Sequence, residues 1–126
     1  MKKTVNSPNA PNPVGPYNQA IQAGAFLFVS GQLPIDPKTG KLAAADITTQ
    51  TRQVMQNIQA ILEAANYTLK DIVQATVYLT SLSLFEDFNI EYAKHFKTDF
   101  PARATVGGVE LKPGALIEIA VVAYKQ

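Results

Sequence analysis

The sequence contains no cysteine, no tryptophan and only one histidine, His95. Without cysteine there are no disulfides, no thiolate nucleophiles and none of the commonest zinc ligands. A lone histidine cannot replace them, and the serines occupy no nucleophile-elbow pattern. We therefore expect no metal site.

An excess of charge of one sign is also absent. The 11 lysines and arginines nearly balance the 10 aspartates and glutamates, which gives a formal net charge of +1. The lysines are spread along the chain and form no basic cluster. Because binding to a phosphate backbone depends on concentrated positive charge, nucleic acid is not expected as an obligate partner.

Long hydrophobic runs are missing as well. Met1-Lys2-Lys3 resembles the start of a signal peptide, but residues 4–9 supply no hydrophobic stretch behind it. We expect no membrane partner, and we expect the protein to be cytoplasmic.

What the chain does contain is typical of one folded domain. Of its 126 residues 47% are hydrophobic, and eight prolines and seven glycines occur without a low-complexity run. A chain of this length buries roughly two-thirds of the surface that it exposes when unfolded. A single domain over residues 1–126 is therefore expected.

The N-terminal part predicts an irregular arm and a hairpin. Residues 1–16 carry four prolines, which fix φ and remove backbone donors, so we expect an extended and irregular arm. Strands are expected at 19–23 and 25–30, joined by a tight turn at Gly24.

Two helices and a strand are expected next. Apolar residues recur at helical spacing from the candidate N-cap Asp46 to Asn66, a residue type that tolerates a left-handed stop. Residues 72–80 alternate as a strand does. An aromatic stripe on a second helix, expected to end near 98–99 before Pro101, is assigned to the core: Phe85, Phe88, Tyr92 and Phe96.

The chain is expected to end in a second hairpin, with strands at 103–110 and 115–123. The order of elements predicts an α+β fold, a mixed sheet with two helices packed on one face. The last strand is apolar on both sides, so the face without helices predicts self-association.

Arg103 and Glu118 stand out because each falls on an apolar strand of this hairpin, and we expect the two strands to pair. A buried unpaired ion costs several kcal/mol, on the order of the stability of a whole domain. In one interpretation the two side chains form an ion pair, and Glu118 also makes a hydrogen bond to a neighbouring strand. In the other, both side chains bind or act on a ligand. An arginine fork suits a carboxylate through two parallel hydrogen bonds.

Other candidates have simpler interpretations. His95 is expected to be a hydrogen-bonded residue on the flank of the second helix, and Asn89 to cap a backbone group on the opposite flank. Tyr17 suits the core or a rim, and Gly107-Gly108 a turn or bulge.

Five short motifs, taken in order, resemble the RidA family, also called YjgF/YER057c/UK114. The resemblance runs essentially from end to end and rests on Gly15-Pro16-Tyr17, Val29-Ser30-Gly31-Gln32, Asn89-x-x-Tyr92, Phe100-Pro101-Ala102-Arg103 and Ile117-Glu118-Ile119.

The resemblance implies a chorismate-mutase-like fold and a homotrimer whose sheets face inward, with three clefts between subunits. It implies hydrolytic deamination of reactive 2-imino acids, such as 2-iminopropanoate and 2-iminobutanoate, to 2-keto acids and ammonia, without a cofactor. The small-molecule partners would be these 2-imino and 2-keto acids.

The resemblance also assigns roles to residues. Arg103 would bind the carboxylate of the imino acid, and Glu118 would position or deprotonate the attacking water. Other positions match those that line the family's cleft: Tyr17, Ser30, Gly31 (through its backbone) and Asn89. Thr105, also expected at the substrate, stands where many relatives carry cysteine, so a thiol cannot be essential here. Gly107-Gly108 replaces a larger apolar residue and puts the substrate preference in doubt.

Three other functions are open at this point. The clefts could serve a trimeric sensor of 2-keto acids or a chaperone-like protein without turnover. A ribonuclease or translation-inhibitor role is disfavoured by the charge pattern. A chorismate mutase is weaker still, because a dicarboxylate substrate calls for several cations and the only arginines are Arg52 and Arg103.

Overall fold

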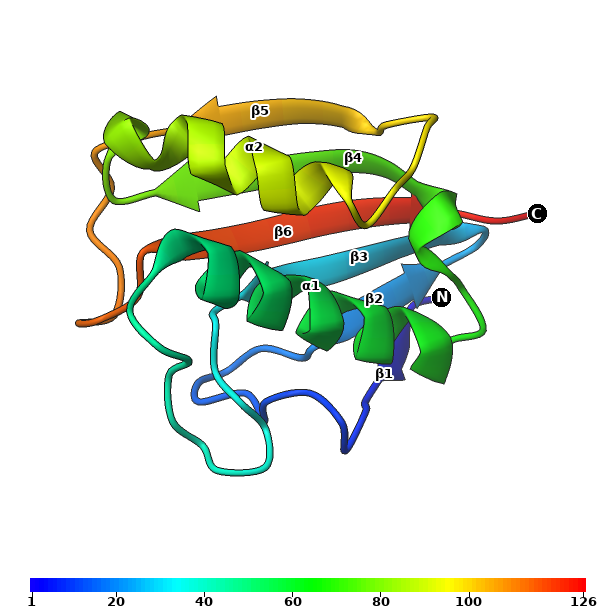
Figure 1. The fold of residues 1–126 in the computed structure, drawn as a ribbon. Coiled ribbons are helices and arrows are strands. Elements are labelled where there is room, and N and C mark those ends of the chain that lie inside the picture. The colour runs from blue at the N-terminus through cyan, green and yellow to red at the C-terminus, as the bar shows by residue number, and fades with distance from the viewer.

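The computed structural model describes residues 1–126, which form one mixed sheet with two helices on one face (Figure 1). The strand order is β1-β2-β3-β6-β4-β5. The elements are β1 (Lys3–Val5), β2 (Ala20–Ala23), β3 (Phe26–Gln32), α1 (Ile47–Ala64), β4 (Ile72–Leu79), α2 (Phe85–Ala93), β5 (Ala102–Val106) and β6 (Ile117–Tyr124), with single 3-10 turns at Leu69–Asp71 and Leu82–Leu84. The predicted α+β architecture is confirmed.

The first hairpin is confirmed, and the arm before it is more regular than expected. β2 and β3 pair antiparallel, and Gly24 takes the positive φ of 60° that their turn requires. Within the arm, β1 adds to the free edge of β2. The prolines begin only at Pro8, so the backbone donors of β1 remain available for pairing.

α1 begins and ends where the sequence predicts. The Asp46 carboxylate accepts a hydrogen bond from the Thr49 backbone N–H at 2.8 Å and so caps the first turn. Past the other end, Asn66 adopts a left-handed φ of 64° that stops the helix. One side of α1 is buried against the sheet, as its apolar spacing predicts.

Two predicted elements differ in detail. The register of β4 against β6 shifts between Ile72 and Gln74, so Ile72 is buried and Val73 is 46% exposed, against the expected simple alternation. α2 stops at Ala93, before the expected end near 98–99, and both Lys97 and Asp99 beyond it have positive φ. The chain therefore leaves the helix well before Pro101.

The predicted C-terminal hairpin is wrong. β5 pairs with β4 in parallel, and β6 lies between β3 and β4 with antiparallel neighbours on both sides. β5 also ends at Val106, because Gly107 and Gly108 leave the sheet there. Arg103 and Glu118 consequently lie on strands separated by β4, and they are not cross-strand neighbours.

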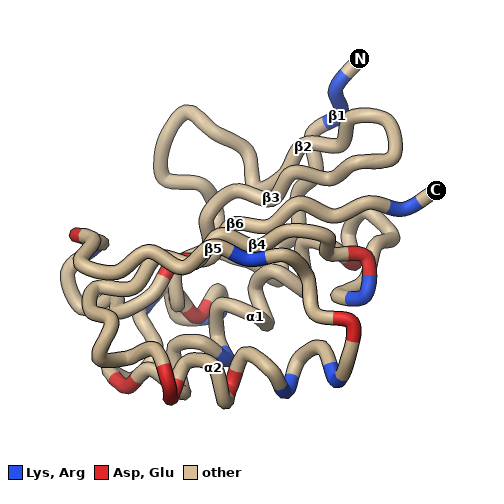
Figure 2. Tube along the Cα trace, turned by 90° about the horizontal axis from the view of Figure 1, so that it is seen from above, with Lys and Arg blue, Asp and Glu red and all other residues tan.

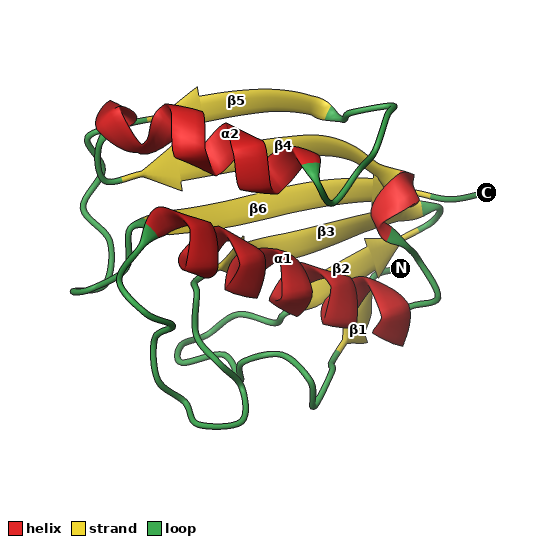
Figure 3. Ribbon diagram, viewed as in Figure 1, coloured by secondary structure: helices red, strands yellow, loops and turns green.

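The helices cover one face of the sheet and leave the other open (Figure 3). Inward-facing residues of β3, β4 and β6 pack with α1 and α2 in a single core. The open face carries apolar side chains that remain accessible in the single chain, among them Phe26, Phe28, Val106 and Tyr124. The predicted uncovered apolar face is confirmed. Neither helix is long and apolar enough to span a bilayer.

Candidate functional site

Arg103 lies on the edge strand β5 and turns toward α2. Its register partner on β4 is Ala75, which is buried beneath the helices, so both side chains point to the helix-covered side. The guanidinium carbon lies over three aromatic rings of α2, at 5.6 Å from the centroid of Phe85, 5.1 Å from Phe88 and 4.9 Å from Tyr92. These rings stabilise the cation through its attraction to the π face.

No carboxylate neutralises Arg103. Every ion pair of the chain involves Glu91, and none reaches the Arg103 guanidinium. The suggested ion pair between Arg103 and Glu118 is therefore absent. A half-buried, aromatic-backed guanidinium without an anionic partner is suited to bind an anion from outside the chain.

A cleft of about 480 Å³ opens beside this arginine. Its lining comes from the middle of α2 and from the segment that leads into β5: Asn89, Tyr92, Ala93, Phe100, Pro101 and Arg103. The structure thus brings Asn89 and Arg103 together at one opening. The Asn89 side chain makes no hydrogen bond within the chain, in contrast to the expected capping role.

Tyr92 also lines this cleft, although its spacing on the helix predicts a core residue. Its ring is 4% exposed and stacks between Phe88 and Phe96, which fits a core position. The same residue also lines the cleft and lies under Arg103. Burial raises the pKa of the Tyr92 phenol, and the positive charge of Arg103 offsets part of that rise.

Glu118 lies on the other side of the sheet. On β6 it alternates with Ile117 and Ile119, which are fully buried under the helices, so its carboxylate points to the open face. This carboxylate makes no hydrogen bond and no ion pair within the chain. Burial raises the pKa of this carboxyl above its ordinary value of 4.5.

Gly31 makes room for this carboxylate. A Cβ built on Gly31 would overlap Oε2 of Glu118, so the carboxylate rests directly over the glycine backbone. The adjacent Ser30 donates its hydroxyl to the Asn18 carbonyl at 2.6 Å. Gly31 and Glu118 therefore form one unit on the open face, with Ser30 beside it.

Tyr17 and Thr105 are placed apart from both groups. The Tyr17 ring is half exposed at the end of the proline-rich arm, and its hydroxyl accepts a hydrogen bond from the Val14 N–H at 3.3 Å. Thr105 is two residues beyond Arg103 on β5, and its partner Val77 is buried, so it lies on the same side of the strand as Arg103.

The predicted site residues therefore form two half-sites within one chain. One half-site, on the helix side, contains Arg103 and Asn89; the other, on the open face, contains Glu118 and Gly31 with Ser30 beside them. β4 and the thickness of the sheet separate them. One copy of the chain does not bring its own arginine and glutamate to one ligand.

A buried ionic cluster between the helices went unpredicted. Glu91 of α2 is 3% exposed and accepts from Arg52 of α1 at 3.1 Å, while His95 lies 3.0 Å from its other oxygen. Burial acts to raise the pKa of Glu91, but the hydrogen bonds from Arg52 and His95 outweigh it and hold that pKa below the ordinary value. The only available signal was the i, i+4 spacing of Glu91 and His95. His95 is hydrogen-bonded as expected, but it lies beyond the end of α2 and not on the flank of that helix.

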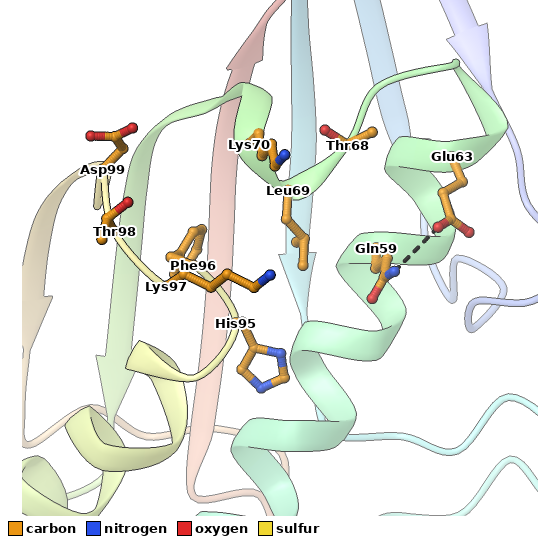
Figure 4. Close-up of a pocket in the computed structure, with 10 residues that line it drawn as sticks. All are labelled: Gln59, Glu63, Thr68, Leu69, Lys70, His95, Phe96, Lys97, Thr98 and Asp99. Atoms are coloured by element: carbon orange, nitrogen blue, oxygen red, sulfur yellow. Dashed lines mark hydrogen bonds between the residues drawn. The ribbon is translucent and has the colours of Figure 1, made fainter.

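Charged side chains in general avoid the sheet. Figure 2 shows acidic and basic positions along α2 and near the chain ends, while the middle strands are mostly uncharged. A larger cavity, of about 620 Å³, lies between the C-terminal ends of the two helices (Figure 4). It contains none of the predicted site residues, and its charges balance, with Lys70 and Lys97 against Glu63 and Asp99.

Known proteins resemble this chain over its whole length. A family model described as Endoribonuclease L-PSP matches residues 7–125. A RutC family protein of Pyrococcus horikoshii is 52% identical over 126 residues, which cover all of both chains. Both similarities thus include all the site residues named above.

Solved structures agree with these matches. A Yersinia pestis protein of unknown function, described as belonging to the conserved Rid protein family, superposes with a TM-score of 0.95 at 45% identity, covering 99% of this chain and 100% of that one. E. coli TdcF, solved with bound serine, superposes with a TM-score of 0.92 at 32% identity, covering 98% and 99%. Serine, the molecule bound to TdcF, is a small molecule that carries a carboxylate.

Proposed function

Because the chain belongs to the Endoribonuclease L-PSP family, which includes the Rid (YjgF/RidA) proteins, we propose that it hydrolyses 2-imino acids to 2-keto acids and ammonia. The proposed substrates are small ones such as 2-iminopropanoate and 2-iminobutanoate. The observation that carries this proposal is the pair of unneutralised ions, Arg103 in a cleft and Glu118 on the open face.

The proposed active unit is a homotrimer with the open faces of the sheets turned inward. Burial of the exposed apolar side chains of that face favours association. In this assembly Arg103 of one copy and Glu118 of a neighbour face the same cleft. The separation of the two half-sites within one chain supports this arrangement.

The helix-side half-site binds the substrate. The Arg103 fork donates two hydrogen bonds to the substrate carboxylate, as planar guanidinium groups do. Asn89 beside it offers an amide for the imine end of the substrate. The serine found in TdcF, at 32% identity, supports a small ligand with a carboxylate and a nitrogen on the adjacent carbon.

The open-face half-site activates water. The water oxygen attacks the imine carbon, the second C=N electron pair moves to nitrogen, and Glu118 accepts the proton of the water. Glu118 returns this proton to the nitrogen of the carbinolamine, the C–N bond breaks, and ammonia leaves as the hydroxyl gives its proton back to Glu118 and becomes the keto group. A protonated imine is already electrophilic, so orientation and one base suffice.

The charge state of Glu118 suits this role. The group must be ionised to accept a proton, and burial, which raises its pKa, makes the ionised carboxylate more basic than that of an exposed glutamate. In the proposed trimer, the cationic imine and the Arg103 of the adjacent copy both favour the ionised form of Glu118.

The test measures ammonia release while an amino acid oxidase generates the imine from alanine in situ. The protein is expected to accelerate ammonia release over buffer, and Arg103→Ala to abolish the acceleration with the oligomer retained. A wild-type rate equal to that of buffer would contradict the proposal. Keto acid binding without turnover would instead indicate a sensor.

A further inference from the structure

The Tyr92 hydroxyl is buried without a hydrogen-bond partner. Its oxygen is shielded from water, and although the Arg103 guanidinium lies close enough to lower the pKa of the phenol, no group of the chain accepts the O–H proton. A buried polar group without a partner is unfavourable, because it has lost its hydrogen bonds to water and gained none in exchange. The hydroxyl therefore lowers the stability of the single chain.

The neighbouring residues show that packing does not require this hydroxyl. The other rings on this side of α2 and of the segment that follows are all phenylalanines: Phe85, Phe88, Phe96 and Phe100. Phenylalanine would fill the Tyr92 position with the same ring and no orphaned polar atom. The hydroxyl thus suggests a function that packing does not explain.

The position of Tyr92 points to the cleft. Its ring centroid lies 4.9 Å from the Arg103 guanidinium carbon, and both residues line the cleft that also contains Asn89. A guanidinium has only donors, so the phenol oxygen can accept from Arg103 but cannot donate to it. Its O–H proton is left for an acceptor that enters the cleft.

We propose that Tyr92 is a second anion-binding residue, whose hydroxyl donates to the carboxylate that Arg103 holds. The raised pKa of the phenol keeps the proton in place at neutral pH, so the group is a donor throughout the working range. This inference rests on the proposed function for its ligand class, a small carboxylate. It assigns Tyr92 to binding, not to proton transfer.

The test compares Tyr92→Phe with wild type for the binding of acetate and of pyruvate by isothermal titration calorimetry. Loss of one hydrogen bond to a charged group should weaken binding of each by about ten-fold. The same substitution removes an orphaned polar atom, so the melting temperature should stay the same or rise. Affinity and stability should thus move in opposite directions.

Tyr67→Phe is the matched control. Tyr67 is equally buried, but its hydroxyl donates to the Ala25 carbonyl at 2.8 Å, away from the cleft. Loss of this hydroxyl should lower the melting temperature and leave the affinities for acetate and pyruvate unchanged. A role in structure alone would make the two variants behave alike.

Equal affinity in Tyr92→Phe and wild type would overturn the inference, and so would a wild-type protein that binds neither carboxylate. The imine assay remains a separate readout. A protein that binds acetate through Tyr92 and yet fails to release ammonia would contradict the deaminase function and leave the inference standing.

Discussion

At the scale of single residues, Gly31 is a position where the side chain of a neighbouring residue, Glu118, leaves no room for a Cβ. An added methyl group would overlap the Glu118 carboxylate, and the side chain would have to turn away. We predict that Gly31→Ala lowers deaminase activity about a hundred-fold, since small displacements of a catalytic group have effects of this size. Steady-state ammonia release checks this prediction.

The control is the double variant Gly31→Ala with Glu118→Gln. If the methyl group acts through Glu118, the double variant should be no less active than Glu118→Gln alone. Additive losses would show that Gly31 acts by another route.

The pKa of Glu118 gives a second prediction. Burial raises it above 4.5, and the ionised form is the active one, so activity should be full above the raised pKa and fall as pH drops through it. The acidic limb of the profile should lie above the ordinary glutamate value. Glu118→Gln should remove the limb together with most of the activity. A limb that persists in this variant would place the base elsewhere.

At this scale the sequence indicated which residues belong to the site better than it indicated which groups surround them. Arg103 and Glu118 could be singled out because each interrupts an apolar strand. Their suggested mutual contact is wrong, because the two strands are consecutive in the chain but are separated by β4 in the sheet. Likewise Tyr92 follows the spacing of a core stripe, and this spacing does not reveal whether its hydroxyl has a hydrogen-bond partner.

At the scale of elements, Glu91 links α2 to α1 through Arg52 and also holds His95, while Lys94 lies 3.5 Å from the same carboxylate. We predict that Glu91→Gln lowers the free energy of unfolding by about 1–2 kcal/mol at neutral pH, because Arg52 is 48% exposed and solvent weakens the pair. Urea unfolding at fixed protein concentration measures it.

The pH dependence follows from the lowered pKa of Glu91. The folded state binds this proton less readily than the unfolded state, for which the ordinary value is 4.5. The stabilisation is therefore complete above 4.5 and is lost as pH falls from there toward the lower folded pKa. The gap between wild type and Glu91→Gln should shrink at about pH 4. An unchanged gap would contradict the assigned ion pair.

Elements with local signals were predictable, and their pairing was not. α1 has a capping residue, a periodic apolar side and a left-handed stop, all within its own residues. β5 and β6 are consecutive apolar strands with a glycine-containing connection, which also describes a hairpin. β5 instead lies parallel to β4, with α2 in the connection between them, a long-range arrangement that no short segment encodes.

At the scale of the whole molecule, the open face of the sheet governs assembly. Phe28 is 47% exposed on this face in the single chain and pairs across the sheet with Val122. We predict that Phe28→Glu converts a trimer to a monomer by light scattering, because a charge would be buried at the contact. Ammonia release should fall to the buffer rate with it.

Ile90→Glu is the control for this substitution. Ile90 is also exposed, but it lies on the solvent side of α2, so a charge there should leave the trimer and its activity intact. A wild-type protein that is monomeric at micromolar concentration would contradict the assembly.

The most direct test of the central claim, that each site joins Arg103 of one copy to Glu118 of another, is complementation. Arg103→Ala and Glu118→Gln chains, each inactive alone, are co-expressed with different affinity tags, and mixed trimers are isolated through both. Any mixed trimer of a cyclic assembly contains one cleft with both native side chains, so about a third of the wild-type rate of ammonia release is predicted. Mixed trimers as inactive as their parents would show that the two residues do not act together across a subunit boundary.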